Sequence, residues 1–278
     1  MTDRYAVIGN PVAHSRSPQI QTAFAAATGQ DIAYVRELAP LDGFTATVRR
    51  LASQGLRGAN VTVPFKEEAF RLADELSPRA RAAGAANTLR FGASGIYADN
   101  TDGAGLVADL TGNLACAIAG RRLLLVGAGG AARGVLQPLL DQRPAALIIA
   151  NRTFDRAQGL AALAIPAAGT TVAAQRFADL AGQRFDVVIN ATSASLAGDL
   201  PPLPAGLFAP GALACDMMYG AADTPFMAWA RNSGAARVAD GLGMLVEQAA
   251  EAFLLWRGVR PDTAAVLAAQ RAALSAQS

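Results

Sequence analysis

A glycine-rich segment in the middle of the chain has the spacing of a phosphate-binding turn. The apolar run Leu123–Val126 predicts a buried strand that stops at Gly127, before a helix-forming stretch. In the pattern G-x-G-x-x-G/A, the first glycine allows a tight turn and the second lets a pyrophosphate approach the backbone. The N–H groups at the start of the following helix favour an anion. We therefore predict a dinucleotide site rather than an ordinary tight turn, with contacts from Gly127, Ala128, Gly129, Gly130 and Ala131.

Two arginines follow the next predicted strand, Ala146–Ala150, at the point where such a fold meets the adenosine ribose. A 2′-hydroxyl prefers Asp or Glu, whereas guanidinium groups pair bidentately with a 2′-phosphate. The alternative is a pair of arginines on a solvated helix start. Because no acid ends this strand, we predict NADP(H) rather than NAD(H) as the cofactor, with contacts from Asn151, Arg152, Thr153 and Arg156.

The chain contains a single lysine among its 24 basic residues, Lys66, and a single histidine, His14. Arginine does not release its proton at working pH, whereas the environment of a lysine amine can be tuned so that it does. Lys66 is therefore a candidate for proton transfer, and a chance surface lysine is the alternative. The role of His14 stays open between a hydrogen bond that orders its loop and proton transfer.

Polar residues cluster at one predicted edge of the N-terminal sheet. Ser15 and Ser17 lie in a strand-to-helix loop, where open α/β sheets bind ligands, although a turn residue and a helix N-cap are the alternatives. We expect Ser17 to be the N-cap, with Pro18 as the first helical residue. Asn60 and Thr62 share one face at the end of a strand, by period-two alternation.

Other polar residues stand near the predicted ends of strands and helices. Lys66 begins a helix after Pro64, and Asp102 lies in the first turn of another helix, where an acid often only complements the helix dipole. Tyr219 follows a strand and either serves a ligand or anchors its loop. Gln248 borders the buried face of a predicted helix, so backbone groups satisfy its amide or it contacts a hydroxylated ligand.

Strand and helix signals alternate along most of the chain, which predicts an α/β fold with two domains. The first has a mainly parallel sheet, and the second is a doubly wound, Rossmann-type domain that begins its sheet near Arg121. Thr192 and Ser193 stand at the end of the fourth main strand of that sheet, across the switch point from Gly127. The expected division is 1–102 for the substrate domain, 103–240 for the NADP domain and 241–278 for helices that return to the first.

Composition limits the class of partner. The chain has 278 residues, of which 52% are hydrophobic, and a formal net charge of +2. Because basic runs and long apolar segments are absent from the sequence, nucleic acid and membranes are poor candidates as partners. One His and two scattered Cys do not support a metal site. Since no leader-like segment is present and the cysteines lack a pairing pattern, we expect a cytoplasmic protein.

Taken together, eight motifs resemble those of the shikimate dehydrogenase family, in order and over nearly the full length: NPVAHSRSP, NVTVPFK, AANT, NTDG, GAGGAARG, NRT, NATS and DGLGMLVEQA. The resemblance implies an oxidoreductase of the shikimate pathway of aromatic amino-acid biosynthesis. Such an enzyme reduces 3-dehydroshikimate reversibly to shikimate by hydride transfer from NADPH. It implies a small-molecule substrate and a monomer or homodimer.

The resemblance also implies roles for single residues. Lys66 and Asp102 would form the catalytic acid–base pair. The hydroxyls and carboxylate of shikimate would meet Ser15, Ser17, Asn60, Thr62, Asn87, Tyr219 and Gln248. In the cofactor site, Thr192, Ser193 and Gly241 would join the residues of the glycine turn and the two arginines.

Two other functions are compatible with parts of the pattern. A quinate/shikimate dehydrogenase that prefers NAD would share the substrate residues, but Arg152 and Arg156 count against it. A non-catalytic sensor would use the same pocket to bind shikimate-like ligands and regulate a partner. The intact pair Lys66 and Asp102, together with the absence of a DNA-binding region, counts against the sensor.

Overall fold

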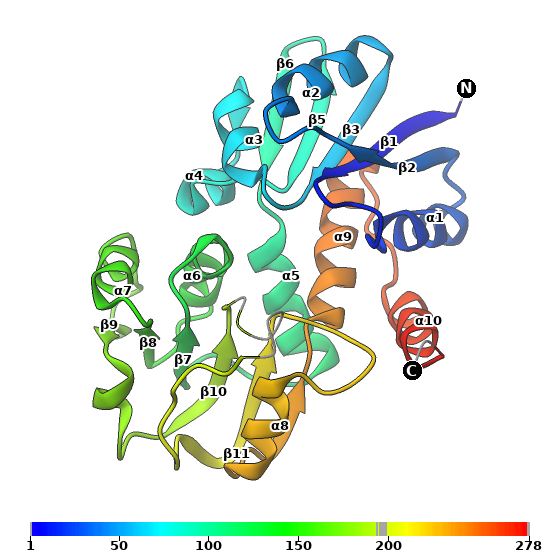
Figure 1. The fold of residues 1–278 in the computed structure, drawn as a ribbon. Helices are drawn as coiled ribbons and strands as arrows, with labels where there is room; N and C mark the ends of the chain where they lie inside the picture. Colours follow the sequence, from blue (N-terminus) through cyan, green and yellow to red (C-terminus); the bar gives the residue numbers. More distant parts are fainter. Residues whose placement is uncertain (1, 193, 195–198, 277–278) are drawn as a thin grey trace. The chain divides into compact units, whose positions relative to one another are not determined.

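The computed structural model describes residues 2–192, 194 and 199–276 (Figure 1). The chain divides into two compact units. Unit 1 comprises Met1–Gly105 and Val246–Ala269, and unit 2 comprises Leu106–Leu245 and Gln270–Ser278. Within the described ranges, none of the helices combines the length and the apolar character needed to cross a bilayer.

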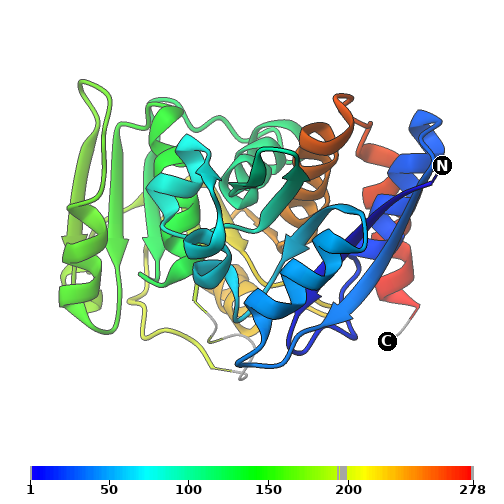
Figure 2. The ribbon, with the colours of Figure 1, turned by 90° about the horizontal axis from the view of Figure 1, so that it is seen from above.

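Unit 1 is built on a six-stranded sheet with the order β2-β1-β3-β5-β6-β4. Only β5 runs antiparallel to its neighbours. Helix α1 packs against β1 and β2, as both views of the ribbon show (Figures 1 and 2). The elements are β1 (Asp3–Gly9), α1 (Ser17–Thr28), β2 (Ile32–Leu38), α2 (Phe44–Ser53), β3 (Leu56–Val61), α3 (Lys66–Leu72), β4 (Glu75–Leu76), α4 (Pro78–Ala83), β5 (Thr88–Gly92) and β6 (Gly95–Asp99).

Alternation along β1 divides the core of unit 1 between the two faces of its sheet. Ala6 and Ile8 join one apolar cluster, whereas Tyr5 and Val7 join another. Successive side chains of a strand point to opposite faces, so a strand covered on both sides reads as a continuous apolar run. β5 and β6 form a hairpin, in which the pairing runs from Thr88 opposite Asp99 to Gly92 opposite Gly95.

Unit 2 contains a second six-stranded sheet, which is parallel throughout and has the order β12-β11-β10-β7-β8-β9. Counted from β7, this is the strand order of a Rossmann fold, with its switch point between β7 and β10. Its elements are η1 (a π-helix, Asp109–Asn113), β7 (Arg122–Val126), α6 (Gly130–Asp141), β8 (Ala146–Ala150), α7 (Phe154–Ala161), β9 (Thr171–Gln175), η2 (a 3₁₀ helix, Phe177–Leu180), β10 (Phe185–Asn190), β11 (Phe208–Asp216), α8 (Pro225–Asn232) and β12 (Arg237–Ala239).

The strands of unit 2 are apolar on both faces. Leu123 and Leu125 of β7 belong to one buried cluster, and Leu124 and Val126 belong to the cluster on the opposite face. Burial on both faces explains why the strand appears in the sequence as an unbroken apolar run. The predicted α/β class, with a mainly parallel first sheet and a doubly wound second sheet, is confirmed.

Three helices include residues of both units. They are α5 (Asp102–Ala108), α9 (Leu242–Arg257) and α10 (Ala264–Ser275). In the part of α9 that belongs to unit 1, Phe253 packs edge-on against Phe24 of α1, with ring centroids 6.0 Å apart. The amide of Gln21 also donates to the carbonyl of Ala249 at 3.0 Å. These contacts attach this part of α9 to the first unit.

The start of α1 differs from the prediction. The N-cap is Arg16, and Ser17 is the first residue of the helix. The backbone of Arg16 already has helical dihedral angles, so the helix begins one residue earlier than expected. The hydroxyl of Ser17 therefore caps no N–H group and accepts a hydrogen bond from the hydroxyl of Ser15 at 3.2 Å instead.

Candidate active site

Lys66 and Asp102 meet in unit 1 as an ion pair. Lys66 is the first residue of α3, just past the end of β3, and Asp102 is the first residue of α5, just past β6. The ammonium of Lys66 donates to Oδ2 of Asp102 at 2.6 Å. The Lys66 side chain is 31% exposed and that of Asp102 is 12% exposed. A partly exposed ammonium held by one carboxylate oxygen can still offer hydrogen bonds to a ligand.

The other carboxylate oxygen of Asp102, Oδ1, accepts a hydrogen bond from a different part of unit 1. Asn87, which precedes β5, donates from Nδ2 to Oδ1 of Asp102 at 2.8 Å. The backbone N–H of Asp102 donates to Oδ1 of Asn100 at 3.1 Å. Because each carboxylate oxygen has its own donor, the plane of the carboxylate is set before a ligand arrives.

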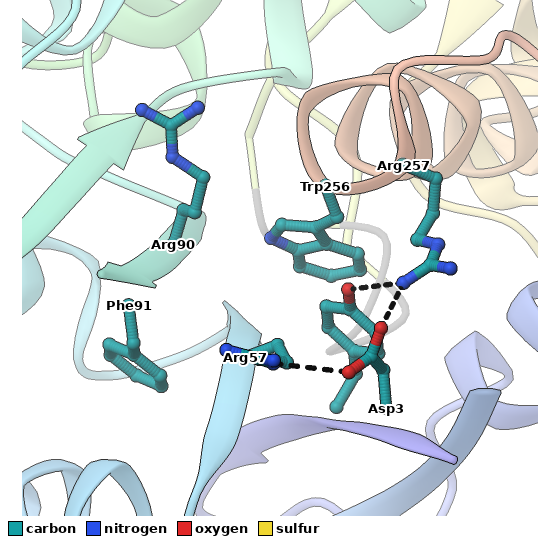
Figure 3. Close-up of a pocket in the computed structure, with 7 residues that line it drawn as sticks. Asp3, Arg57, Arg90, Phe91, Trp256 and Arg257 are labelled. Atoms are coloured by element: carbon teal, nitrogen blue, oxygen red, sulfur yellow. Dashed lines mark hydrogen bonds and ion pairs between the residues drawn. The ribbon is translucent and has the colours of Figure 1, made fainter. Parts of the chain in front are cut away.

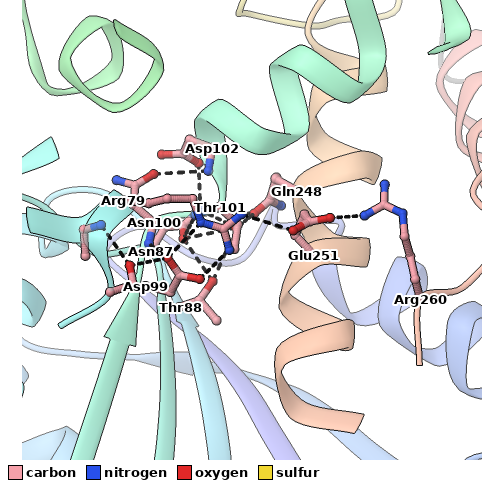
Figure 4. Close-up of polar contacts among 12 residues, drawn as sticks. Arg79, Asn87, Thr88, Asp99, Asn100, Thr101, Asp102, Gln248, Glu251 and Arg260 are labelled. Atoms are coloured by element: carbon pink, nitrogen blue, oxygen red, sulfur yellow. Dashed lines mark hydrogen bonds and ion pairs between the residues drawn. The ribbon is translucent and has the colours of Figure 1, made fainter. Parts of the chain in front are cut away.

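A buried polar cluster surrounds this carboxylate (Figure 4). The carbonyl oxygen of the Asn87 side chain accepts from the backbone N–H of Thr101 at 2.8 Å and from the hydroxyl of Thr88 at 2.9 Å. Oε1 of Gln248 on α9 accepts from Asn87 and from the Thr101 hydroxyl, both at 3.2 Å. The pairing of β5 with β6 places Asn87 beside residues 100–102, and α9 supplies Gln248.

A group of charged side chains adjoins this polar cluster and holds part of it in place. Asp99, the last residue of β6, is 2% exposed and pairs with the Arg79 guanidinium of α4 at 2.5 Å. It also accepts from the Ser77 hydroxyl at 2.5 Å and from the backbone N–H of Asn100 at 2.7 Å. Arg79 in turn contacts Glu251 of α9 at 3.1 Å. This pairing fixes Asn100, whose side chain receives the N–H of Asp102.

The hydrogen bonds and ion pairs among these charged side chains shift the pKa values of Asp99 and Arg79. Burial raises the pKa of Asp99, but the hydrogen bonds from Arg79 and Ser77 outweigh burial, so the pKa of Asp99 lies below its ordinary value. Burial lowers the pKa of the Arg79 guanidinium, yet Asp99 and Glu251 raise it above its ordinary value. Both groups therefore stay charged at neutral pH.

The two serines lie together in the loop that enters α1. Ser15 Oγ accepts from the backbone N–H of Ser17 at 3.3 Å while it donates to the Ser17 hydroxyl. The guanidinium of Arg36 holds the carbonyl of Ser15, with Nε at 2.9 Å and NH2 at 2.5 Å. The loop is therefore ordered by contacts to its backbone, which leaves hydroxyl lone pairs for a ligand.

Asn60 and Thr62 lie at the end of β3. The amide of Asn60 is engaged by protein groups, because its Oδ1 accepts from the Tyr34 hydroxyl at 2.7 Å and its Nδ2 donates to the Thr88 hydroxyl at 3.1 Å. Burial raises the pKa of Tyr34, which keeps this phenol neutral and able to donate. Thr62 is half-buried, and a side chain at Gly9 would overlap its methyl group.

Unit 2 has the geometry of a dinucleotide site at the end of β7. Gly127 has φ +111°, and a Cβ there would lie 3.2 Å from the backbone of Ala191, so glycine is required. A Cβ at Gly129 or Gly130 would meet only open space. Gly129 is the N-cap of α6 and carries no side-chain cap, so the first N–H groups of this helix face outward and can hold a phosphate.

The residues that follow β8 offer cations to a ribose phosphate. Arg152 and Arg156 are exposed, and neither guanidinium has a hydrogen-bond or ion-pair partner in the described part of the chain. The amide of Asn151 donates to the carbonyl of Thr153 at 2.9 Å, which shapes the turn into α7. The local arrangement suits a dinucleotide with an extra phosphate, since a guanidinium binds phosphate bidentately.

The remaining predicted residues are also in unit 2. The Thr192 hydroxyl donates to Oδ1 of Asn190 at 2.7 Å, at the end of β10. A side chain at Gly241 would overlap the carbonyl of Met217, so only glycine fits at this position. Tyr219 follows β11 and is half-buried, in a different unit from the other predicted substrate residues. Ser193 lies outside the described residues.

Several residues of the polar cluster escaped the sequence analysis. Thr101 and Asn100 stand in the NTDG motif, which pointed to Asp102 alone, and their closeness to Asp102 in the sequence was a usable signal. Arg79 and Asp99 gave no such signal. Their pairing depends on the short helix α4, which the sequence pattern did not indicate, and on its packing against β6.

Sequence comparison finds three family models along the chain. Residues 7–89 match the shikimate dehydrogenase substrate binding domain. Residues 109–197 match the model described as shikimate / quinate 5-dehydrogenase. Residues 241–269 match the shikimate 5′-dehydrogenase C-terminal domain.

Similar proteins match over nearly their whole length. A shikimate dehydrogenase (NADP(+)) of Aromatoleum aromaticum is 63% identical over 97% of this chain and 97% of its own length. One of Dechloromonas aromatica is 59% identical over 99% and 100%. Among solved structures, an enzyme of Pseudomonas putida is 50% identical over 96% of this chain and 98% of its own, with a TM-score of 0.91. Shikimate 5-dehydrogenase of Thermus thermophilus, solved with NADP(H) and shikimate, is 33% identical over 98% and 100%, with a TM-score of 0.86.

Proposed function

The chain belongs to the family of NADP-dependent shikimate dehydrogenases, and from this premise we propose how its own residues carry out the reaction of that family. The reaction is the reversible NADPH-dependent reduction of 3-dehydroshikimate to shikimate, a step of aromatic amino-acid biosynthesis. The observation that carries the proposal is the contact between Lys66 Nζ and Asp102 Oδ2 at 2.6 Å, within a cluster of polar side chains.

Lys66 moves the proton. Bound NADPH supplies the hydride that adds to the ketone carbon, and NADP⁺ accepts it in the reverse direction. Negative charge then develops on the ketone oxygen, and a neighbouring cation stabilises it. The ammonium of Lys66 donates a proton to that oxygen during reduction. During oxidation the neutral amine takes the proton from the hydroxyl of shikimate.

Asp102 orients Lys66. Its Oδ2 accepts one N–H of the ammonium, and its Oδ1 is held by Asn87, so the amine is kept at one position. The remaining N–H groups of Lys66 are then available to the reacting oxygen. A fixed donor adds more to the rate than a mobile one, because no reorganisation is needed in the transition state.

Polar side chains around the pair hold the substrate in this proposal. In unit 1 the hydroxyls of Ser15, Ser17 and Thr62 have donors and acceptors to offer to a carboxylate or a hydroxyl group. Asn87 and Gln248 lie within one hydrogen-bonded cluster with Asp102. Asn60 is engaged by Tyr34 and Thr88, so in our proposal it presents one remaining lone pair. Tyr219 contributes from unit 2.

The cofactor is NADP(H), and the proposal assigns its contacts within unit 2. The pyrophosphate lies against the open backbone of Gly129 and Gly130 at the start of α6. Ala128 and Ala131 line the same turn, and Asn151 and Thr153 shape the loop that bears the arginines. The 2′-phosphate pairs with Arg152 and Arg156. Thr192, Ser193 and Gly241 complete the predicted cofactor contacts.

We further propose that the enzyme works in the cytoplasm, as a monomer or homodimer. Both cysteines, Cys116 and Cys215, are buried and free, as is typical of proteins in a reducing compartment. Nucleic acid and membranes have no part in the proposed function, which needs only the two small-molecule ligands.

The test follows the absorbance of the reduced nicotinamide. Purified protein is given shikimate with either NADP⁺ or NAD⁺, and the assays are repeated with quinate. Rapid reduction of NADP⁺ by shikimate, with little reduction of NAD⁺, is the expected result. A preference for NAD⁺ or quinate would favour the quinate/shikimate alternative. Absence of turnover, while shikimate still raises the melting temperature, would favour the sensor.

A further inference from the structure

A second polar pocket lies in unit 1, at the end of the sheet opposite to the catalytic residues. Its lining comes from the first residues of β1 and β3, from β5 and from the C-terminal end of α9 (Figure 3). The catalytic pair follows the carboxyl ends of β3 and β6, so the two sites are separated by the length of the strands. The pocket has a volume of about 260 Å³ and is lined by Asp3, Tyr5, Arg57, Arg90, Phe91, Trp256 and Arg257.

Positive charge exceeds negative charge in this lining. Arg57 and Arg257 direct their guanidinium groups toward Asp3, the only carboxylate among the described lining residues. The third arginine of the lining, Arg90, places its guanidinium over the ring of Tyr97, 4.8 Å from the ring centroid. Arg57 and Arg257 flank Asp3, with Nε of Arg57 at 3.1 Å from Oδ1 and NH1 of Arg257 at 2.5 Å from Oδ2 (Figure 3). These two hydrogen bonds lower the pKa of Asp3, so it stays ionised at neutral pH and leaves the pocket with a net positive charge.

Part of this charge is not used within the protein. Arg57 is 64% exposed and meets Asp3 through Nε alone. In the described part of the chain, its terminal nitrogens NH1 and NH2 have no hydrogen-bond partner. The terminal N–H groups of a guanidinium form a planar fork that matches a carboxylate. Arg57 therefore presents an anion-binding edge to the pocket.

The floor beside this edge is aromatic and held in place. The Trp256 indole stacks on Tyr5 with ring centroids 4.7 Å apart, and its Nε1 donates to the carbonyl of Leu89 at 2.9 Å. A Cβ at Gly58 would overlap the indole, so glycine makes room for the ring. Phe91 adds a third aromatic ring to the lining, beside Trp256 and Tyr5, and is half-buried. Such a floor binds a flat apolar body without first having to be ordered.

We propose that this pocket is a second ligand site, which binds a small aromatic carboxylate. The carboxylate pairs with the free edge of Arg57, and the ring lies against Trp256 and Phe91. A hydroxylated, non-aromatic acid such as shikimate suits the site poorly, because it would place hydroxyl groups against the apolar floor. The site does not depend on the proposed catalytic roles, since it shares no residue with them.

Fluorescence of Trp256 provides the test, with benzoate as the probe. The chain has two tryptophans, so the Trp229→Phe background leaves Trp256 as the sole reporter. Benzoate is expected to change its emission with a saturable dependence on concentration. Arg57→Gln is expected to weaken binding by about tenfold or more, because a charge-assisted pair is lost. Arg49→Gln, an equal charge change at an exposed position of α2, is the matched control and is expected to leave binding unchanged.

Acetate tests the aromatic part of the proposal without any change in Arg57. It has the carboxylate but lacks the ring, so it is expected to bind about tenfold more weakly than benzoate. An emission that does not respond to benzoate would overturn the proposal, as would equal losses in Arg57→Gln and Arg49→Gln. Equal binding of acetate and benzoate would also overturn it. Inactivity towards shikimate would count against the proposed reaction but would leave this test intact.

Discussion

Lys66 is the residue on which the proposed chemistry depends most. It is the only lysine of the chain, and its ammonium lies 2.6 Å from Asp102 while remaining partly exposed. An arginine at this position would keep the ion pair but would not release a proton. The chemistry therefore needs an amine here, whereas the ion pair by itself does not.

The first prediction concerns Lys66→Ala. Loss of the proton donor is expected to lower kcat by about 10²- to 10⁴-fold, with little change in KM for shikimate, because other side chains hold the substrate. Lys66→Arg is expected to lose kcat to a similar extent. Steady-state assays in both directions measure this. Arg71→Ala, at an exposed position of the same helix α3, is the control and is expected to retain normal kcat. A Lys66→Ala enzyme with near-normal kcat would refute the assignment.

In the proposed function, Arg152 and Arg156 decide between NADP⁺ and NAD⁺. Both are exposed and, within the described residues, unpaired, so their charge is available to a 2′-phosphate. Replacing both by Gln is expected to raise KM for NADP⁺ by about ten- to hundredfold, which corresponds to a combined loss of about 1.4–2.8 kcal/mol from two solvent-exposed, screened contacts. KM for NAD⁺ is expected to stay unchanged.

Arg184→Gln is a suitable control for these two arginines. Arg184 is exposed and precedes β10, so it lies at the amino end of the strands, away from the edge that binds the dinucleotide. If this variant raised KM for NADP⁺ as much as the double variant, net charge rather than a specific contact would explain the effect.

At the scale of elements, the helix α4 and the strand β6 position the carboxylate of Asp102. Arg79 of α4 holds Asp99, Asp99 receives the N–H of Asn100, and Asn100 receives the N–H of Asp102. Arg79 also reaches Glu251 of α9, which pairs in addition with Arg260. The elements thus hold the site through ion pairs, with Asp99 buried and Arg79 partly exposed, as well as through apolar packing.

A pH-dependent prediction follows for Arg79→Met. The folded pKa of Asp99 lies below its unfolded value of about 3.9, so its contribution to stability is present above that value and is lost as the pH falls through the folded pKa. Without Arg79, burial would instead raise the pKa of Asp99. The variant is expected to lose about 2–3 kcal/mol at pH ~7, a figure below that for a fully buried pair because Arg79 is partly exposed.

The difference in unfolding free energy between the unaltered protein and Arg79→Met should then shrink in acid. Below pH ~4 the variant's Asp99 is protonated and no longer leaves a buried charge unpaired, so the gap in unfolding free energy narrows. Urea unfolding across this pH range measures it. Arg81→Met, on the exposed side of α4, is the control and is expected to cost well under 1 kcal/mol. A gap that stays constant with pH would contradict the role given to Asp99.

At the scale of the whole molecule, the two ligands are assigned to two units. The proposed substrate residues other than Tyr219 lie in unit 1, and the glycine turn and the two arginines lie in unit 2. Amide hydrogen exchange can distinguish the binding site of one ligand from that of the other. Shikimate is expected to slow exchange of amides around 15–17, 60–66 and 100–103, and NADP⁺ to slow exchange around 127–131 and 151–156, because ligands protect the segments that they order. Protection of unit 1 alone by NADP⁺ would contradict the assignment.

The sequence by itself determined the fold class and the chemistry available. Continuous apolar runs, such as Leu123–Val126, are a local pattern, and burial on both faces of a parallel sheet is its direct cause. The glycine turn is local as well, since the left-handed φ of Gly127 is a demand on one residue. The single lysine and the missing acid after Ala146–Ala150 are facts of composition and position that need no structure.

The tertiary structure decided which of these residues meet. Asn87, Asp102 and Gln248 are far apart in the sequence, and strand register together with the packing of α9 brings them into one cluster. Long-range pairs such as Arg79 with Asp99, or Arg257 with Asp3, have no local signature, because a salt bridge leaves no period in the chain. The backbone angles of Arg16 likewise decided that Ser17 is the first helical residue and not the N-cap, whereas the residue type alone suits both a cap and a ligand contact.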